Sequence, residues 1–277
     1  MPDRLVFETR EALDQDLANA IVAQLESGIE TRGSATLVVS GGSTPKGLFK
    51  TLSSASIDWA KVTLLLADER WVAEDHEDSN TRLVKSLLLK NNAKAANWID
   101  FGAGSVDHET ELARINQQLG HSGPFDVVIL GMGGDSHTAS LFPCSAELSE
   151  GLTTPHSALM TQPTTAPHRR LSLSKTRLLN THMGVIHIVG DSKLDVYETA
   201  TVRPDHDAHP VSHFAHARHF SLWFAPWTQQ KKGSTKAPKH SHLKHLSRVA
   251  YAYRCDGHKA SRIQHSVRKS PLVVIPR

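Results

Sequence analysis

One apolar run that ends in glycines constrains the fold of this chain more than any other feature. Residues 125–130 read Phe-Asp-Val-Val-Ile-Leu, which is typical of a strand buried on both faces of a parallel sheet. Residues 131–137 follow as Gly-Met-Gly-Gly-Asp-Ser-His. Open α/β sheets bind their ligands at the carboxyl ends of the strands. The stretch therefore predicts a parallel α/β sheet that carries an acid–base pair, Asp135 and His137, at its ligand-binding edge.

Further apolar runs alternate with segments of helical spacing. Residues 35–39, 62–67, 185–189 and 220–224 are short runs with the composition of buried strands, and helical patterns lie between most of them. This alternation predicts a doubly wound, mainly parallel sheet flanked by helices. Thr9 is expected to begin the first helix, because a hydroxyl side chain is a favoured N-cap.

Charge divides the chain into two parts. The 277 residues carry a formal net charge of +3, but residues 227–277 hold +11 and residues 1–226 hold −8. We therefore expect a globular domain over residues 1–226 and a basic, disordered extension over 227–277. The acidic domain shows no motif for a specific nucleic-acid site.

Two negative features indicate where the protein works. No apolar run reaches the roughly 18 residues that a membrane-spanning helix needs, and the N-terminus lacks the apolar region of a signal peptide. The only cysteines, Cys144 and Cys255, form neither a disulfide framework nor a zinc cluster. These features predict a cytoplasmic protein with reduced thiols and no membrane association.

A second glycine-rich turn follows the run at residues 35–39. It reads Ser-Gly-Gly-Ser-Thr-Pro at residues 40–45, and we expect Thr44 to cap the next helix with Pro45 in its first position. Free backbone N–H groups at a helix N-terminus bind anions, so this turn is a candidate phosphate site. It is not a Walker loop, because Gly-Lys-[Ser/Thr] is absent. The candidate residues are Gly41, Gly42, Ser43 and Thr44.

Charged residues stand at the ends of other predicted strands. Asp68 and Arg70 follow the run at residues 62–67, Arg170 begins a strand, and Lys193 lies just past the run at residues 185–189. Each of them alone is also compatible with an ordinary surface charge. Their shared place at strand ends favours a common site at one edge of the sheet.

Two polar segments are expected to be irregular. Residues 150–168 are rich in Thr, Pro and Ser and predict an exposed loop. Residues 203–219 contain five histidines at short intervals, but prolines interrupt the helical spacing and no set of acids or cysteines accompanies them. We interpret that segment as a solvated loop rather than a metal site.

Taken in order, these motifs resemble those of the 6-phosphogluconolactonase family, which is related to glucosamine-6-phosphate deaminase. The resemblance covers roughly residues 5–226. It implies a Rossmann-like α/β fold, a monomer in the cytoplasm and no metal or organic cofactor, with a small sugar-phosphate lactone as the binding partner. The motifs that carry it lie at residues 40–45, 68–72, 78–80, 130–143 and 170–173.

The resemblance also implies a reaction, the hydrolysis of 6-phospho-D-glucono-1,5-lactone to 6-phosphogluconate in the pentose phosphate pathway. On this hypothesis His137 is the general base for an attacking water, and Asp135 or Asp68 orients its imidazole. Backbone N–H groups at residues 131–134, or Arg70, would hold the oxyanion. The substrate phosphate would be bound by Gly41, Gly42, Ser43 and Thr44 together with Arg70, Arg170 and Lys193.

The chain departs from the family pattern at three places. Ser136 stands where the family usually has glycine, so a positive φ there would add strain next to His137. Ala73 replaces a common proline. The family also ends near residue 226, so it does not account for the extension over residues 227–277.

Other functions remain open from the residues alone. A catalytically weakened sugar-phosphate-binding protein is one, and a sugar-phosphate isomerase or deaminase is another, although residues 140–143 lack the acid of the deaminase motif. Gly134-Asp-Ser136-His-Thr138 begins like a nucleophile elbow, but its fifth position is not glycine. The turn does not match the Gly-x-Gly-x-x-Gly motif of a dinucleotide-binding loop, because Ser136 stands at the position of the third glycine.

Overall fold

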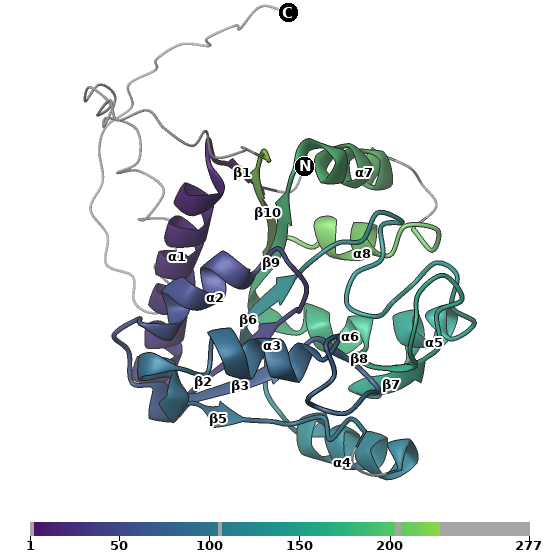
Figure 1. The fold of residues 1–277 in the computed structure, drawn as a ribbon, viewed down its shortest axis with the longest axis horizontal. Coiled ribbons are helices and arrows are strands. Elements are labelled where there is room, and N and C mark those ends of the chain that lie inside the picture. The colour runs from purple at the N-terminus through teal and green to yellow at the C-terminus, as the bar shows by residue number, and fades with distance from the viewer. Residues whose placement is uncertain (1–2, 105–106, 203–205, 228–277) are drawn as a thin grey trace, which may run out of the picture. The chain divides into compact units, whose positions relative to one another are not determined.

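The computed structural model describes residues 3–104, 107–202 and 206–227. Their main feature is a seven-stranded sheet in the order β1-β10-β9-β6-β2-β3-β5, in which all neighbouring strands are parallel (Figure 1). The predicted parallel α/β fold is thus confirmed. The extension expected at residues 227–277 lies outside the described residues, except for Trp227. The sheet consists of β1 (Asp3–Val6), β2 (Ala35–Val39), β3 (Val62–Leu66), β5 (Asn97–Trp98), β6 (Phe125–Leu130), β9 (Thr181–Val189) and β10 (Phe220–Ala225).

A small antiparallel sheet joins the carboxyl end of β3. It has the order β4-β8-β7, with β4 at Asp68–Arg70, β7 at Ala158–Thr161 and β8 at Arg170–Leu173. The backbone N–H of Leu173 donates to the carbonyl of Ala67 over 2.9 Å. This contact joins the small sheet to the edge where the large one binds ligands.

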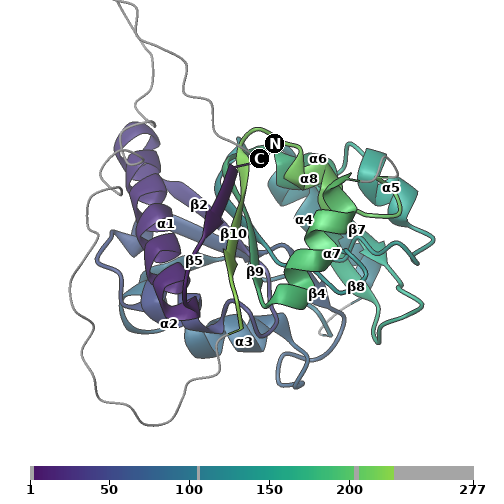
Figure 2. The same ribbon diagram turned by 90° about the horizontal axis from the view of Figure 1, so that it is seen from above.

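Helices lie on the two faces of the large sheet. Seen from above, α1 and α2 lie on one side of β1, β9 and β10, whereas α7 and α8 lie on the other (Figure 2). None of the helices within the described ranges combines the length and apolarity needed to cross a membrane. The helices are α1 (Arg10–Arg32), α2 (Lys46–Ser53), α3 (Asn80–Leu87), α4 (His108–Gly120), α5 (Leu148–Thr153), α6 (Lys175–Leu179), α7 (Asp191–Val202) and α8 (Val211–Ala215), with 3-10 turns η1 (Trp59–Lys61) and η2 (Asn91–Ala95).

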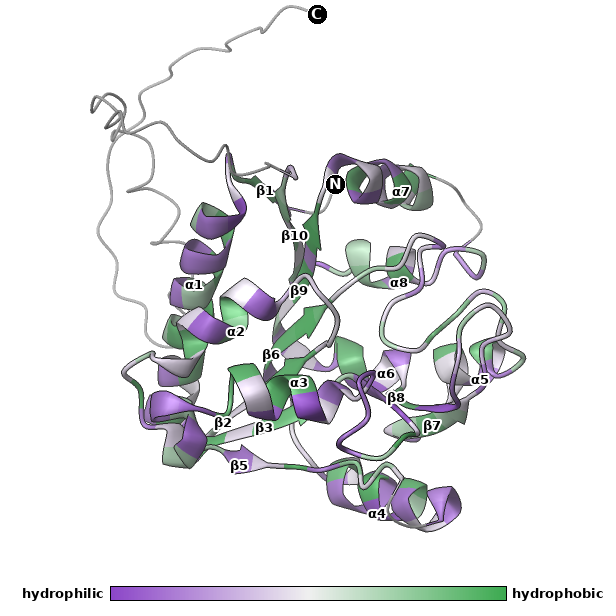
Figure 3. Cartoon of the chain, viewed as in Figure 1, coloured by the Kyte–Doolittle hydropathy of each residue, from purple (hydrophilic) through white to green (hydrophobic). Residues whose placement is uncertain are grey.

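The core follows the apolar pattern of the sequence. All six residues of β6 are buried, and the arrow of β6 is largely hydrophobic in colour (Figure 3). In α1 the apolar residues at helical spacing are buried against the sheet, and Thr9 caps the helix by accepting a hydrogen bond from Ala12 N over 3.1 Å, as predicted. Burial of apolar surface on both faces explains why β6 lies at the centre of the sheet.

Two predicted loops contain regular structure. Within residues 150–168, α5 ends at Thr153 and β7 follows as a fully buried strand, so the expectation of an exposed loop is wrong. The Thr- and Pro-rich composition hid a four-residue apolar strand that is stabilised by pairing with β8. Within residues 206–219, α8 begins after Pro210 and packs the buried Phe214, so this segment is not simply a solvated loop.

The two glycine-rich turns meet at the centre of the sheet. Strands β2 and β6 are neighbours, and the chain continues from β2 to β3 on one side and from β6 to β9 on the other. Such a reversal of direction is a topological switch point, where open α/β sheets form a ligand crevice. The topology therefore brings the turns after β2 and β6 together.

Candidate active site

The turn after β6 is fastened by its own hydrogen bonds. Gly133 N donates to the carbonyl of His137 over 2.9 Å, and Ser136 N donates to the carbonyl of Gly133 over 3.2 Å. The hydroxyl of Thr138 donates to the carbonyl of Gly131 over 2.8 Å. These bonds fold residues 131–138 into a compact turn that directs the side chain of His137.

His137 and Asp135 form an acid–base pair at the surface of this turn. Nδ1 of His137 lies 2.5 Å from Oδ1 of Asp135, which also accepts a hydrogen bond from the His137 backbone N–H over 3.2 Å. The His137 side chain is 26% exposed, so solvent and small molecules reach it. Burial raises the pKa of Asp135, but the hydrogen bond and charge of His137 outweigh it, so the net shift is downward. An ionised Asp135 fixes the proton on Nδ1 and leaves Nε2 as the basic nitrogen.

The imidazole is confined from two sides. Its ring stacks on Phe142, with the ring centroids 3.8 Å apart and the planes 20° from parallel. On the other side, a Cβ added to Gly133 would lie 2.1 Å from the Cε1 and Nδ1 atoms of His137. A glycine is therefore required at residue 133, because any side chain would displace the ring.

Ser136 has the backbone conformation that the missing glycine would favour. Its φ is +65°, which confirms the expected strain next to His137. The side chain is buried, and its hydroxyl lies 2.5 Å from the Asp135 carbonyl, 2.9 Å from Nδ1 of His209 and 3.5 Å from the Ala208 carbonyl. Ser136 is only 1% exposed, so it does not present a nucleophile to a substrate. This burial removes the nucleophile-elbow alternative.

Asp68 lies in a different set of contacts from Asp135. Its Oδ2 accepts a hydrogen bond from the hydroxyl of Ser140 over 2.6 Å and lies 4.0 Å from Nη1 of Arg170. Of the two carboxylates expected to orient His137, it is Asp135 that contacts the imidazole. Asp68 instead supports the small sheet and the segment that follows the His137 turn.

Two predicted cations are neighbours across the small sheet. Arg70 in β4 and Arg170 in β8 are register partners. Nη1 of Arg70 donates to the carbonyl of Asp78 over 2.5 Å and to Oδ1 of Asn80 over 3.1 Å, which fixes its position. Placing like charges side by side favours an anion between or beside them.

Arg170 is the more buried of the pair. Its guanidinium lies 5.0 Å from the centroid of Phe142, the ring that stacks on His137, and is 6% exposed. Burial lowers the pKa of Arg170, although Asp68 opposes the shift. The Nε atoms of both Arg70 and Arg170 are buried without a hydrogen-bond partner. Two guanidinium groups that are held in place near the His137 turn would favour the binding of an anion there.

The turn after β2 lies against the same group of residues. A Cβ on Gly41 would lie 1.9 Å from Oδ1 of Asn80, the atom that holds Arg70. Gly42 has a φ of +89°, which glycine tolerates best. The carbonyls of Ser43 and Thr44 accept hydrogen bonds of 2.9 and 2.8 Å from Arg10.

The start of α2 differs from the prediction. The helix begins at Lys46 with Pro45 as its N-cap, and no side chain caps it, so the expectation that Thr44 would cap this helix is wrong. The proline's fixed φ and the bonds from Arg10 shape the turn instead. The uncapped N-terminus leaves backbone N–H groups available to an anion.

Lys193 approaches the His137 turn from α7. Its Nζ donates to the carbonyl of Met132 over 2.6 Å. Burial lowers the pKa of Lys193, and the charge of Asp135 opposes that shift. Lys193 thus contacts the turn that carries Asp135 and His137.

The sequence analysis assigned no role to several supporting residues, although most of them lie within its motifs. Glu69 is buried and its carboxylate accepts hydrogen bonds from Asn80 N and Thr81 N at the start of α3, over 2.9 and 2.6 Å. Burial raises the pKa of Glu69 despite these bonds. Glu69 is 11 and 12 residues away from these two partners in the chain, so no local sequence pattern indicated the contacts. The other supporting residues are Arg10, Asn80, Ser140 and Phe142.

Comparison with known proteins identifies the family. Residues 8–223 match the model of the family described as glucosamine-6-phosphate isomerases/6-phosphogluconolactonase. A 6-phosphogluconolactonase of Rhizobium meliloti is 39% identical over 209 residues, or 74% of this chain and 90% of the relative. One of Neisseria meningitidis serogroup A is 39% identical over 203 residues, or 70% of this chain and 86% of the relative.

Solved structures agree. A 6-phosphogluconolactonase of Shewanella baltica has a TM-score of 0.76 at 43% identity and covers 81% of this chain and 97% of its own. A monomeric glucosamine-6-phosphate deaminase has a TM-score of 0.68 at 16% identity over 80% of this chain and 97% of its own, which shows a shared fold alone. The chain belongs to the glucosamine-6-phosphate isomerase/6-phosphogluconolactonase family.

Proposed function

We propose that this chain hydrolyses 6-phospho-D-glucono-1,5-lactone to 6-phosphogluconate in the pentose phosphate pathway. The observation that carries the proposal is the His137–Asp135 pair, which lies beside Lys193 and close to Arg170 through Phe142. A base next to several cations suits an ester substrate that carries a phosphate. The names of the relatives, 6-phosphogluconolactonases at 39% identity, support the same reaction.

The base is His137. A δ-lactone is a reactive ester, so a positioned water is sufficient and no covalent nucleophile is needed. Nε2 accepts the proton as the water oxygen attacks C1 of the lactone, and Asp135 stabilises the imidazolium through Nδ1. When the tetrahedral intermediate collapses, the bond between C1 and the ring oxygen breaks. The imidazolium then returns its proton to that oxygen, which yields the open-chain acid.

The oxyanion at C1 needs donors that are already in place. Gly133 N is bonded to the carbonyl of His137, so we assign the role among residues 131–134 to the N–H of Gly134. Arg70 is the second donor, because the hydrogen bonds of its Nη1 hold the guanidinium in position. Fixed donors stabilise the developing charge without reorganising during the reaction.

The phosphate of the substrate binds to the turn after β2. Gly41, Gly42, Ser43 and Thr44 present backbone N–H groups near the start of α2, and the hydroxyls of Ser43 and Thr44 add further donors. Arg170 and Lys193 supply positive charge. The bonds from Arg10 to the carbonyls of Ser43 and Thr44 hold the turn in the shape that aims its N–H groups outward.

The alternative functions are not favoured. An isomerase or deaminase would need an acid within residues 140–143, where the chain has Ser-Leu-Phe-Pro and the Ser140 hydroxyl is bonded to Asp68. A weakened sugar-phosphate binder was suggested by Ser136. The hydrogen bond between Ser136 and His209 holds the turn that carries His137 in place despite the serine. Because the base keeps its position, we favour hydrolysis over binding alone.

The setting of the reaction is also proposed. A phosphorylated sugar is charged and does not cross membranes freely, so a cytoplasmic enzyme meets it where it is formed. We further propose that the chain acts as a monomer, because the turns after β2 and β6 meet at the switch point of one sheet and can form the site without a second copy.

The proposal is tested by following 6-phosphogluconate formation from freshly prepared lactone, corrected for spontaneous ring opening. The unphosphorylated lactone is the control substrate. We expect much faster hydrolysis of the phosphorylated lactone. Thermal stabilisation by 6-phosphogluconate without any acceleration of hydrolysis would contradict the enzyme and support the binder.

A further inference from the structure

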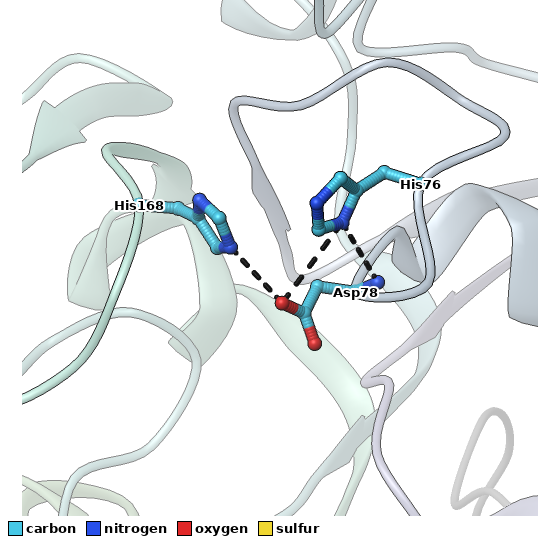
Figure 4. A group of neighbouring side chains, drawn as sticks. All are labelled: His76, Asp78 and His168. Atoms are coloured by element: carbon cyan, nitrogen blue, oxygen red, sulfur yellow. Dashed lines mark hydrogen bonds and ion pairs between the residues drawn. The ribbon is translucent and has the colours of Figure 1, made fainter.

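A histidine–aspartate–histidine group lies beyond the arginine pair. His76 and Asp78 lie in the loop before α3, and His168 lies in the turn before β8 (Figure 4). Nε2 of His168 lies 3.0 Å and Nδ1 of His76 lies 3.9 Å from the same carboxylate oxygen, Oδ2 of Asp78. Among the described ranges this is the group in which three metal-binding side chains converge. None of the three has a part in the proposed reaction.

We propose that His76, Asp78 and His168 form a binding site for a divalent transition metal ion of the zinc class. One ligand atom from each residue lies within 4.8 Å of the others. A point equidistant from atoms separated by 3.0, 3.9 and at most 4.8 Å lies roughly 2.0–2.4 Å from each of them. Zinc binds nitrogen and carboxylate ligands at about 2.0–2.2 Å, so side-chain shifts of a few tenths of an ångström complete the site.

The ligands are accessible and in suitable forms. The side chains of His76, Asp78 and His168 are 41, 45 and 26% exposed, so an ion reaches them from solvent and water fills the remaining position. Nε2 of His168 and Oδ2 of Asp78 lie 3.0 Å apart, and an ion between them would take the place of the proton that they share. Nδ1 of His76 accepts a hydrogen bond from Asp78 N over 3.1 Å, so this nitrogen carries a lone pair. On metal binding, the lone pair would coordinate the ion in place of the N–H group.

The neighbouring charges decide which class of ion fits. Arg70 donates to the carbonyl of Asp78, so positive charge lies close to the group. Magnesium and calcium prefer several carboxylate oxygens, and this site offers one carboxylate beside a cation. Imidazole nitrogens bind zinc, cobalt and nickel ions more strongly than they bind magnesium or calcium, which selects the transition metals.

An ion at this site would join the two segments that hold the arginines. The Asp78 carbonyl accepts from Arg70, and the carbonyl of Pro167, next to His168, accepts from Arg170 over 3.3 Å. The ion would therefore act as a clamp between the loop before α3 and the turn before β8. It takes no part in bond breaking, so the site goes beyond the proposed hydrolysis and is tested by binding.

The test titrates the full-length protein, stripped of metal with a chelator, with ZnCl2 by calorimetry and with CoCl2 by visible absorption. His168→Asn is the main variant, because asparagine tolerates the φ of +69° at residue 168 better than most residues. His76→Asn is the second variant. His182→Asn is the control, since it removes an exposed histidine at the start of β9.

We expect the wild type and the control His182→Asn to bind one Zn²⁺ that the two site variants, His168→Asn and His76→Asn, do not bind. If the site variants still bind this ion, we expect their affinity to be at least about tenfold lower. Zn²⁺ should also raise the melting temperature of the wild type more than that of either site variant. Circular dichroism of the metal-free proteins checks folding, and either site variant that folds is sufficient for the comparison. Equal stoichiometry and affinity in all four proteins would assign zinc binding to other histidines and overturn the proposal.

Discussion

The hydroxyl of Ser136 lies 2.9 Å from Nδ1 of His209, so the turn that carries His137 is held by a segment 73 residues further along the chain. The carbonyl of Ser136 also accepts a hydrogen bond from Val211 N over 3.1 Å. Ser136 has a positive φ that most residues avoid, and the two contacts offset this strain. His209 is thus a positioning residue for His137.

Removing the imidazole of His209 tests this role. His209→Ala leaves the buried Ser136 hydroxyl without that partner and should lower the free energy of unfolding by about 1–2 kcal/mol. The looser turn should lower kcat several-fold and leave KM for the lactone unchanged. Ser136→Gly removes about 1 kcal/mol of strain but also the hydroxyl, so its net effect on stability should be small.

Urea denaturation and steady-state kinetics measure both effects, and the double variant gives the coupling between residues 136 and 209. His216→Ala, in the same segment but exposed, is the matched control. Strictly additive effects of the two changes would show that the contact does not hold the turn.

The space around the imidazole predicts opposite outcomes for two adjacent glycines. Gly133→Ala places a Cβ 2.1 Å from the His137 ring and should lower kcat by about 10²-fold or more, because a misplaced base loses its geometry. Gly134→Ala meets no atom within 4 Å and should retain most of the activity. The comparison needs only kcat of the two folded variants. Equal activities would mean that the position of this ring does not limit catalysis.

The arginine in β8 should act mainly on substrate affinity. Arg170→Lys keeps a positive charge near Asp68 but removes the planar fork, and we expect KM for the phosphorylated lactone to rise about tenfold. Arg169→Ala, the exposed neighbour, is the control and should leave KM unchanged. An unchanged KM in Arg170→Lys would exclude bidentate binding of the phosphate by this side chain.

A buried pair of ionisable residues, Asp14 and His187, predicts two opposing effects of pH on stability. Burial raises the pKa of Asp14 to about 6 and lowers the pKa of His187 to about 3, and their side chains lie 3.8 Å apart. The contribution of Asp14 to the free energy of unfolding is at its maximum below about pH 4, and it is lost as the pH rises through 6. The contribution of His187 to the free energy of unfolding is at its maximum above about pH 6.5, and it is lost as the pH falls toward 3.

Single substitutions separate these effects. In Asp14→Asn only the histidine effect remains, so stability should rise with pH between about 4 and 6.5. In His187→Leu only the aspartate effect remains, so stability should fall over about the same range. Asp14→Asn should also be more stable than the wild type at pH 7, by about 1–3 kcal/mol. Urea midpoints between pH 4 and 7 measure the slopes, and parallel curves for both variants would contradict the assignment.

The sequence predicted the five inner and long strands of the large sheet, β2, β3, β6, β9 and β10, because most of their residues are buried, whereas the exposed edge strands β1 and β5 were not predicted. In β6 every residue is buried, and the strand appears in the sequence as an apolar run that only Asp126 interrupts. The small sheet was not predicted. Its strands have three or four residues, and the pairs of β4 with β8, such as Asp68 with Ser172, join segments about a hundred residues apart. Pairing over that distance leaves no local periodicity.

The residues of the candidate site were also predicted in part, whereas the contacts between its turns were not. Strand ends identified His137, Asp135, Arg170 and Lys193, because ligands bind at that edge of the sheet. The contacts of Asn80 with Gly41 and of Phe142 with His137 depend on how separate turns pack, and the sequence does not encode that packing in a local pattern.

The most direct test of the account compares initial rates of 6-phosphogluconate formation by the wild type and by His137→Asn, both corrected for spontaneous opening of the lactone. Asparagine keeps an N–H donor near the position of Nδ1, which can still bond to Asp135, but it cannot accept the proton from water. The account predicts a fall in kcat of about 10²–10⁴-fold in a variant whose melting temperature matches the wild type. A folded variant within a few-fold of the wild-type rate would show that this imidazole is not the base.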